Sequence, residues 1–144
     1  MEDLIIFVVL FGSSYLIGRY KEKKHFADIV RREKELLALP ALTLKRADEQ
    51  PIAKAKLVTG NVVIAGDYFK QIMAVLASLF GMRISVAESM MDRARREAVL
   101  RMKEQAAGAD AILNVRIQSM QIGDRKSVNG VEVMACGTAI YYAQ

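Results

Sequence analysis

The sequence predicts an α+β domain in which two helices cover one face of a small antiparallel sheet, preceded by one transmembrane helix. Three observations lead to this prediction: an uncharged apolar run between Asp3 and Arg19, helical patterns through the middle of the chain, and an alternating hairpin pattern in its last third. A length of 144 residues leaves room for one globular unit. We therefore expect an anchor at 1–18, a juxtamembrane helix at 19–40 and the α+β domain at 41–144.

The first element is the apolar run, which has acids before it and a basic cluster after it. Its 15 uncharged residues would give a helix of about 23 Å, short of a hydrocarbon core of about 30 Å. A secretory signal, a buried helix and an interfacial segment are alternatives, but the charge order and the missing polar face favour a single-pass anchor. The predicted anchor residues are Leu4, Ile5, Ile6, Phe7, Val8, Val9, Leu10, Phe11, Leu16 and Ile17.

The charges beside this run predict the orientation. Lys and Arg are retained on the cytoplasmic side, which places the N-terminus outside and the domain in the cytoplasm. The expected localisation is the inner (cell) membrane, with the lipid bilayer as one partner.

Residues 19–39 predict a continuation of the helix, with Phe26, Ile29 and Leu36 at helical spacing and Pro40 as its stop. This segment could form a short coiled-coil stalk or pack against its own domain, and the sequence leaves both open.

Beyond Pro40 the pattern predicts a short strand at 41–45 and a longer strand at 52–65. An apolar helix at 67–80 and a second helix at 85–107 follow, the latter opened by the capping pair Ser85 and Glu88. The arginines of the second helix alternate with acids, which predicts a solvated face.

The last third predicts a hairpin with strands at 110–120 and 131–142 and a turn at 123–130. On the first strand, one face would carry Ala111, Leu113, Val115 and Ile117, and the other Ile112, Asn114, Arg116 and Gln118. On the second, Val133, Ala135, Gly137, Ala139 and Tyr141 would share a face.

Five short motifs resemble the YbjQ-like family of small bacterial proteins over residues 42–142. The most specific pair is Gly-Ala-Asp-Ala at 108–111 with Gly-Thr-Ala at 137–139, supported by segments at 56–64, 81–85 and 94–98. Met82 and Cys136 depart from the family pattern. The family is described as heavy-metal-binding and has no established activity. The resemblance implies a dodecin-like subunit that closes into a ring, commonly a pentamer.

The ligand inventory argues against metal chemistry and catalysis within one chain. His25 and Cys136 are the only histidine and cysteine, and no metal-ligand spacing, catalytic triad or phosphate-binding loop is present. Cys136 is the one candidate ligand for a heavy metal, although a small buried hydrophobic role suits it better. No aromatic residues are interleaved with the basic residues of the helix at 85–107, so we expect no nucleic-acid binding. The missing catalytic machinery leads us to expect no enzyme activity.

These observations predict a membrane-anchored, ring-forming structural or interaction module with an unidentified protein partner. Alternatives are a heavy-metal module whose metal is lost in Cys136→Ser, and a binder of a small ligand between subunits. The candidate inter-subunit residues are Asn114, Arg116, Gly137, Thr138 and Ala139, with plain solvent exposure as the alternative for the first two.

Overall fold

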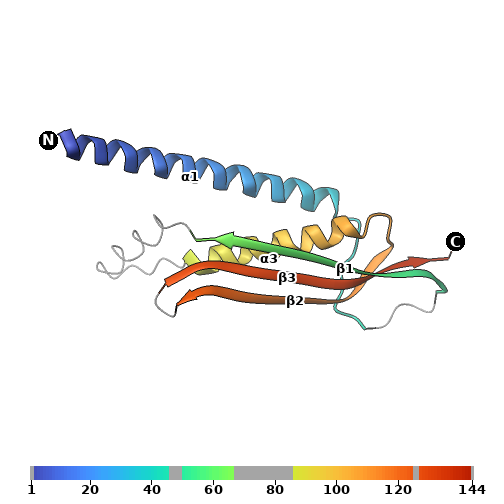
Figure 1. Ribbon diagram of the computed structural model, residues 1–144. Helices are drawn as coiled ribbons and strands as arrows, with labels where there is room; N and C mark the ends of the chain where they lie inside the picture. The colour runs from blue at the N-terminus through green and yellow to red at the C-terminus, as the bar shows by residue number, and fades with distance from the viewer. Residues whose placement is uncertain (1, 46–49, 67–85, 125–126, 144) are drawn as a thin grey trace.

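The computed structural model stacks a long helix, a second helix and a three-stranded sheet as successive layers (Figure 1). It describes residues 2–45, 50–66, 86–124 and 127–143. The elements of the described chain are α1 (Glu2–Glu35), β1 (Ile52–Ala65), α3 (Val86–Gln105), β2 (Ala111–Asp124) and β3 (Ser127–Tyr142). The predicted α+β class and the predicted strand at 52–65 are confirmed. The predicted helix at 67–80 and Ser85 lie outside the described residues.

The sheet is antiparallel, with β3 between β1 and β2. The hairpin strands are longer than predicted, because β2 continues to Asp124 and β3 already begins at Ser127. The predicted strand at 41–45 is reduced to a single bridge between Ala41 and Ile112, supported by hydrogen bonds along the first part of β2.

The core lies between α3 and one face of the sheet, which we call the inner face. A narrow stripe of small residues on α3 packs on β1 and β3. It meets Val131, Val133, Ala135 and Ala139 of β3, all fully buried. The fully buried residues of the stripe are Ala94, Ala98, Met102 and Ala106. Gly108 follows the helix with φ +76°, the left-handed conformation that commonly ends a helix.

The predicted faces of β2 are wrong on one side of a β-bulge. The pairing with β3 shifts between Leu113 and Arg116, and Asn114 has φ +53°. The extra residue reverses the alternation. As a result Ile112 is fully buried in the main core, whereas Leu113 joins Ala111 and Ile140 in a small cluster on the opposite, outer face.

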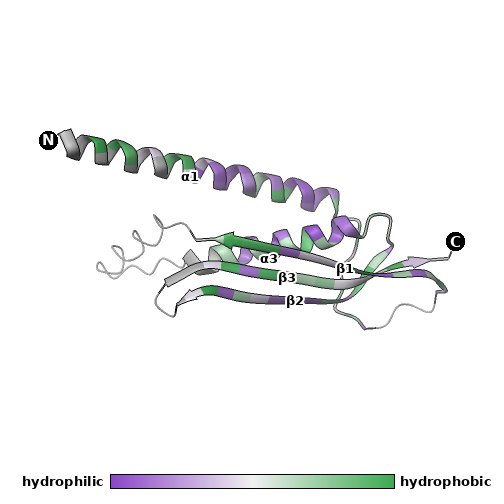
Figure 2. Ribbon diagram, viewed as in Figure 1, coloured by the Kyte–Doolittle hydropathy of each residue, from purple (hydrophilic) through white to green (hydrophobic). Residues whose placement is uncertain are grey.

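The structure of α1 contradicts the predicted membrane anchor. In the part of the chain that the structure describes, no helix has the length and the apolar character needed to cross a bilayer. The uncharged run is only 15 residues, about 23 Å of helix, and α1 continues from it without a break to Glu35. Figure 2 shows the change from apolar to polar residues along this one helix. The transmembrane helix and the single-pass inner-membrane localisation are therefore wrong.

The polar half of α1 packs against α3, which decides between the two interpretations left open for residues 19–39. Ile29 is fully buried in this contact, and Lys103 Nζ donates a hydrogen bond of 3.1 Å to the carbonyl of Leu36. The helix therefore docks on its own domain.

Candidate functional site

The distal half of β2 is the most unusual surface of the described chain. Every residue from Arg116 to Gly123 is exposed, because α3 covers β1 and β3 and barely reaches β2. Ile117 lies on the inner face and is 45% exposed, while Met120 and Ile122 lie on the outer face and are 65% and 42% exposed. A strand that leaves apolar side chains uncovered on both faces is unusual, since sheets normally bury at least one.

The apolar surface of β2 continues across the outer face of the sheet. The register places Met120 opposite Glu132 of β3, and Glu132 opposite Val63 of β1. Val63 is 60% exposed, and Met134, one pair further along, is 38% exposed. We call Ile117, Met120, Ile122, Val63 and Met134 the β2 patch.

The two edges of the sheet differ in how far they are covered. The beginning of β2 is paired with the segment after α1: Ile112 N–H donates to the carbonyl of Pro40 at 2.9 Å, and Leu42 N–H donates to the carbonyl of Ile112 at 2.8 Å. On the β1 edge, side chains of α3 occupy two backbone groups. Gln105 accepts from Thr59 N–H at 3.2 Å, and Arg101 donates to the carbonyl of Asn61 at 2.8 Å.

The edge of β2 beyond the bulge has no such cover among the described residues. An uncovered edge strand is a template for pairing with another chain. Three of the five residues of the β2 patch, Ile117, Met120 and Ile122, lie on this same stretch of the edge strand.

Cys136, the candidate metal ligand, lies half-buried on the outer face of the central strand. Its neighbours across the ladders are Thr59 on β1 and Arg116 on β2. Heavy metals prefer several soft ligands, and an arginine beside the thiol opposes a cation. No group of three or more His, Cys, Asp or Glu side chains suited to a metal occurs among the described residues. The described residues of one chain therefore do not offer a ligand set that fits a heavy metal.

The predicted inter-subunit residues do not share one surface in the structure. Asn114 forms the bulge, and Arg116 is exposed on the outer face at the start of the β2 patch. Gly137 lies against Ile112 of its own chain, and Ala139 is fully buried in the core. Thr138 is half-buried on the outer face. Their role between subunits stays a prediction.

The large apolar residues of the β2 patch were not among the predicted site residues. The visible signal is that Ile117, Met120 and Ile122 do not keep to one face of an alternating strand. The register places Ile117 on the inner face and Met120 and Ile122 on the outer face, so both faces of the distal half of β2 carry exposed apolar residues.

Part of the charged face of α3 is not solvated as predicted, although Arg95 and Arg101 are exposed. Arg96 makes a bidentate ion pair with Glu33 of α1, with distances of 2.7 and 2.5 Å. Glu97 is 3% exposed and pairs with Arg32 of α1 and with Arg101 at 3.0 Å. This side of α3 is thus the docking surface for α1 rather than a solvated face.

A family model and the related sequences place this chain in the same protein family. Residues 41–143 match the YbjQ family, whose description is "Putative heavy-metal-binding". A UPF0145 protein of Vibrio campbellii is 41% identical over 92 residues, covering 62% of this chain and 85% of the relative. One from Dehalococcoides mccartyi strain BAV1 is 40% identical over 96 residues, covering 65% and 88%. A crystal structure of a protein with unknown function from Pediococcus pentosaceus is 14% identical, covers 73% of this chain and 98% of its own, and has a TM-score of 0.42.

Proposed function

The chain belongs to the YbjQ family, and on that premise we propose that it is a non-catalytic interaction module that assembles with copies of itself into a closed ring. The resemblance implies a pentamer. The observation that carries the proposal is the distal half of β2, where eight consecutive strand residues are exposed and no other described residue covers the edge.

The occupant we assign to this surface is a second copy of the chain. Backbone groups on an uncovered edge can be satisfied by another strand, and apolar residues on both faces of β2 would then be buried by the same contact. Burying one large apolar side chain gains about 1.5–3 kcal/mol, so the five residues of the β2 patch can stabilise a specific contact. In the isolated chain these apolar side chains are in contact with water, which is unfavourable in free energy, and assembly would bury them.

A closed ring follows if the contact joins two different surfaces. Head-to-tail contacts generate rings when the rotation closes, whereas a self-complementary contact gives a dimer. The β1 and β2 edges are differently covered, since α3 side chains bind groups of β1 and the 40–44 segment binds the start of β2. This asymmetry favours a head-to-tail arrangement in which the distal part of β2 meets a different surface of its neighbour.

Native mass spectrometry and sedimentation velocity on the purified full-length chain test the proposal. We expect one species whose mass is a whole number of three or more chains. Met120→Lys places a charge in the β2 patch and should shift the species to monomer. The matched control is Leu37→Lys, because Leu37 is 79% exposed beyond the end of α1 and away from the sheet.

A monomeric or dimeric wild-type chain would refute the ring. Equal dissociation by Met120→Lys and Leu37→Lys would refute the assignment of the contact to β2. The same spectra report bound metal, and a mass excess abolished by Cys136→Ser would favour the heavy-metal alternative.

A further inference from the structure

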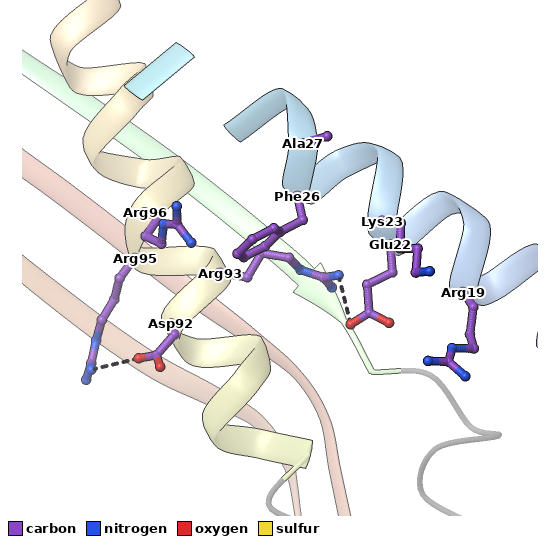
Figure 3. A pocket seen from close by; sticks show the side chains of 9 residues that line it. All are labelled: Arg19, Glu22, Lys23, Phe26, Ala27, Asp92, Arg93, Arg95 and Arg96. Atoms are coloured by element: carbon purple, nitrogen blue, oxygen red, sulfur yellow. Dashed lines mark ion pairs between the residues drawn. The ribbon is translucent and has the colours of Figure 1, made fainter. Parts of the chain in front are cut away.

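A cavity of about 750 Å³ lies between α1 and α3, on the far side of α3 from the sheet (Figure 3). Arg19, Glu22 and Phe26 extend into it from α1, and Arg93 and Arg96 reach toward it from α3. Its volume falls in the range of small-molecule sites, which is roughly 300–1,000 Å³. The proposed assembly through β2 does not involve these residues.

The lining of this cavity carries an excess of positive charge. Five of its residues are cationic, namely Arg19, Lys23, Arg93, Arg95 and Arg96, and two are acidic, namely Glu22 and Asp92. Arg96 is held by its bidentate ion pair with Glu33. Arg93 lies 3.7 Å from Glu22, whereas Arg95 points away from α1 in Figure 3 and lies 3.9 Å from Asp92. Charge-assisted hydrogen bonds are normally about 2.7–2.9 Å. Arg93 therefore has only a long ion pair among the described contacts, and Lys23 is exposed on the facing helix.

Arg93 gives a second and independent indication of a ligand. Its side chain is 20% exposed, and its Nε atom is buried without a hydrogen-bond partner. Buried polar groups in folded proteins nearly always have a partner, so an unsatisfied guanidinium N–H beside a cavity calls for an acceptor. An anionic oxygen in the cavity would supply one.

The other wall of the cavity is apolar. Phe26 is 48% exposed and Ala27 lies beside it, while the Arg96 guanidinium stacks over the Phe26 ring at 4.8 Å from its centroid. The cavity is much larger than a bare anion, and this aromatic wall can contact the body of a larger molecule.

We propose that this cavity binds a phosphate monoester whose remaining part is apolar or planar, a molecule of the size of a mononucleotide. A phosphate carries a charge of about −1.5 to −2 at neutral pH and three strong acceptor oxygens. These match an excess of several cations better than a single carboxylate would. Arginine binds phosphate oxygens in a bidentate manner, and Arg93 of α3 and Lys23 of α1 line the cavity from its two helices.

Isothermal titration calorimetry on the full-length chain tests this site with three probes: AMP, adenosine and inorganic phosphate. AMP carries both halves of the proposed ligand, so we expect a Kd of about 1 mM or tighter. Adenosine and inorganic phosphate should each bind at least about tenfold more weakly, because each lacks one half.

Two matched variants distinguish the cavity from general attraction to a basic protein. Lys23 lines the cavity and Lys24, the next residue of α1, does not, although both are exposed. We expect Lys23→Glu to weaken AMP binding by about tenfold or more and Lys24→Glu to leave it within about twofold. Both variants should keep the circular dichroism spectrum of the wild type, since neither side chain is buried.

Three results would overturn the proposal. AMP could fail to bind at 10 mM (roughly the weakest affinity worth assigning to a site), or it could bind no better than adenosine. Equal weakening by Lys23→Glu and Lys24→Glu would show that the attraction is a property of the whole basic surface. None of these results depends on whether the chain forms a ring, so the site and the assembly are tested separately.

Discussion

At Gly60 the middle of β1 passes directly under α3. A Cβ atom at this position would lie 2.0 Å from the carbonyl oxygen of Ala98 and 2.6 Å from the backbone nitrogen of Met102. Both are backbone atoms of the helix, so they cannot move aside as a flexible side chain would. The close contact of helix and sheet, and with it the position of the arginines on the far side of α3, therefore depends on a residue without a side chain.

We expect Gly60→Ala to destabilise the protein by about 3 kcal/mol, because even one methyl group would push α3 off the inner face. Urea unfolding followed by circular dichroism measures the effect. Gly12→Ala is the matched control, since Gly12 lies in α1 with nothing within 4 Å of an added Cβ. That change should leave the midpoint unchanged or raise it slightly, because alanine favours helix by up to about 1 kcal/mol. A stable Gly60→Ala would contradict the packing described.

The residues of the hairpin strands β2 and β3 show which side-chain faces could be predicted from the sequence and which could not. The inner face of β3 was predicted correctly, because Val133, Ala135 and Ala139 alternate without interruption. The faces of β2 were not, because the bulge at Asn114 depends on how β2 pairs with β3 rather than on its own pattern. Asparagine tolerates positive φ, but a single asparagine within a strand pattern is not enough to predict a bulge.

Between elements, the docking of α1 on α3 is largely ionic. Burial alone would lower the pKa of Arg32, and hydrogen bonds to Glu97 and Glu104 outweigh this effect and raise it. The hydrogen bond from Arg96 holds the pKa of Glu33 below its usual value, although burial acts in the other direction. Apolar contact is small by comparison, with Ile29 as the fully buried member.

The pH dependence of this docking follows from the lowered pKa of Glu33. Since its folded pKa lies below the ordinary value of 4.5, the stabilisation is fully present above that value and is lost as the pH falls through the folded pKa. We expect urea midpoints to fall between pH 5 and about pH 3. Glu33→Gln should reduce this acid sensitivity.

Glu35→Gln serves as the control for this prediction. Glu35 lies on the same helix, but its ion pair with Arg31 stays within α1 and is exposed. It should therefore retain the acid sensitivity of the wild type. An identical response of both variants would place the acid-sensitive group elsewhere.

These ion pairs explain why the sequence misplaced the charged face of α3. Arginines alternating with acids look the same whether they face water or a second helix with complementary charges. Glu33 and Arg96 are 63 residues apart, so no local pattern connects them. The predicted helix at 85–107 agrees closely with α3 (Val86–Gln105), since a helical pattern depends on residues near one another in the chain.

On the scale of the whole molecule, the two ends of β2 differ. One end of this strand is paired with residues 40–44 of the same chain, and at the other end no described residue covers the edge, which is the surface that we propose for assembly. The sequence predicted an assembly from family resemblance. It did not predict the surface, because exposure of β2 arises from the offset of α3 toward β1 and β3.

Hydrogen–deuterium exchange distinguishes the two ends of β2 in a single experiment. In an assembly built through the β2 patch, edge amides between residues 116 and 123 should exchange slowly in the wild type and at least about tenfold faster in Met120→Lys, since they lose a strand partner. The internal control is the start of the same strand, where Ile112 and Asn114 N–H groups donate to Pro40 and Leu44 at 2.9 and 2.7 Å. Those amides should exchange alike in both proteins. Fast exchange over residues 116–123 in the wild type would mean that this edge faces water, and the interaction surface would then have to lie elsewhere on the sheet.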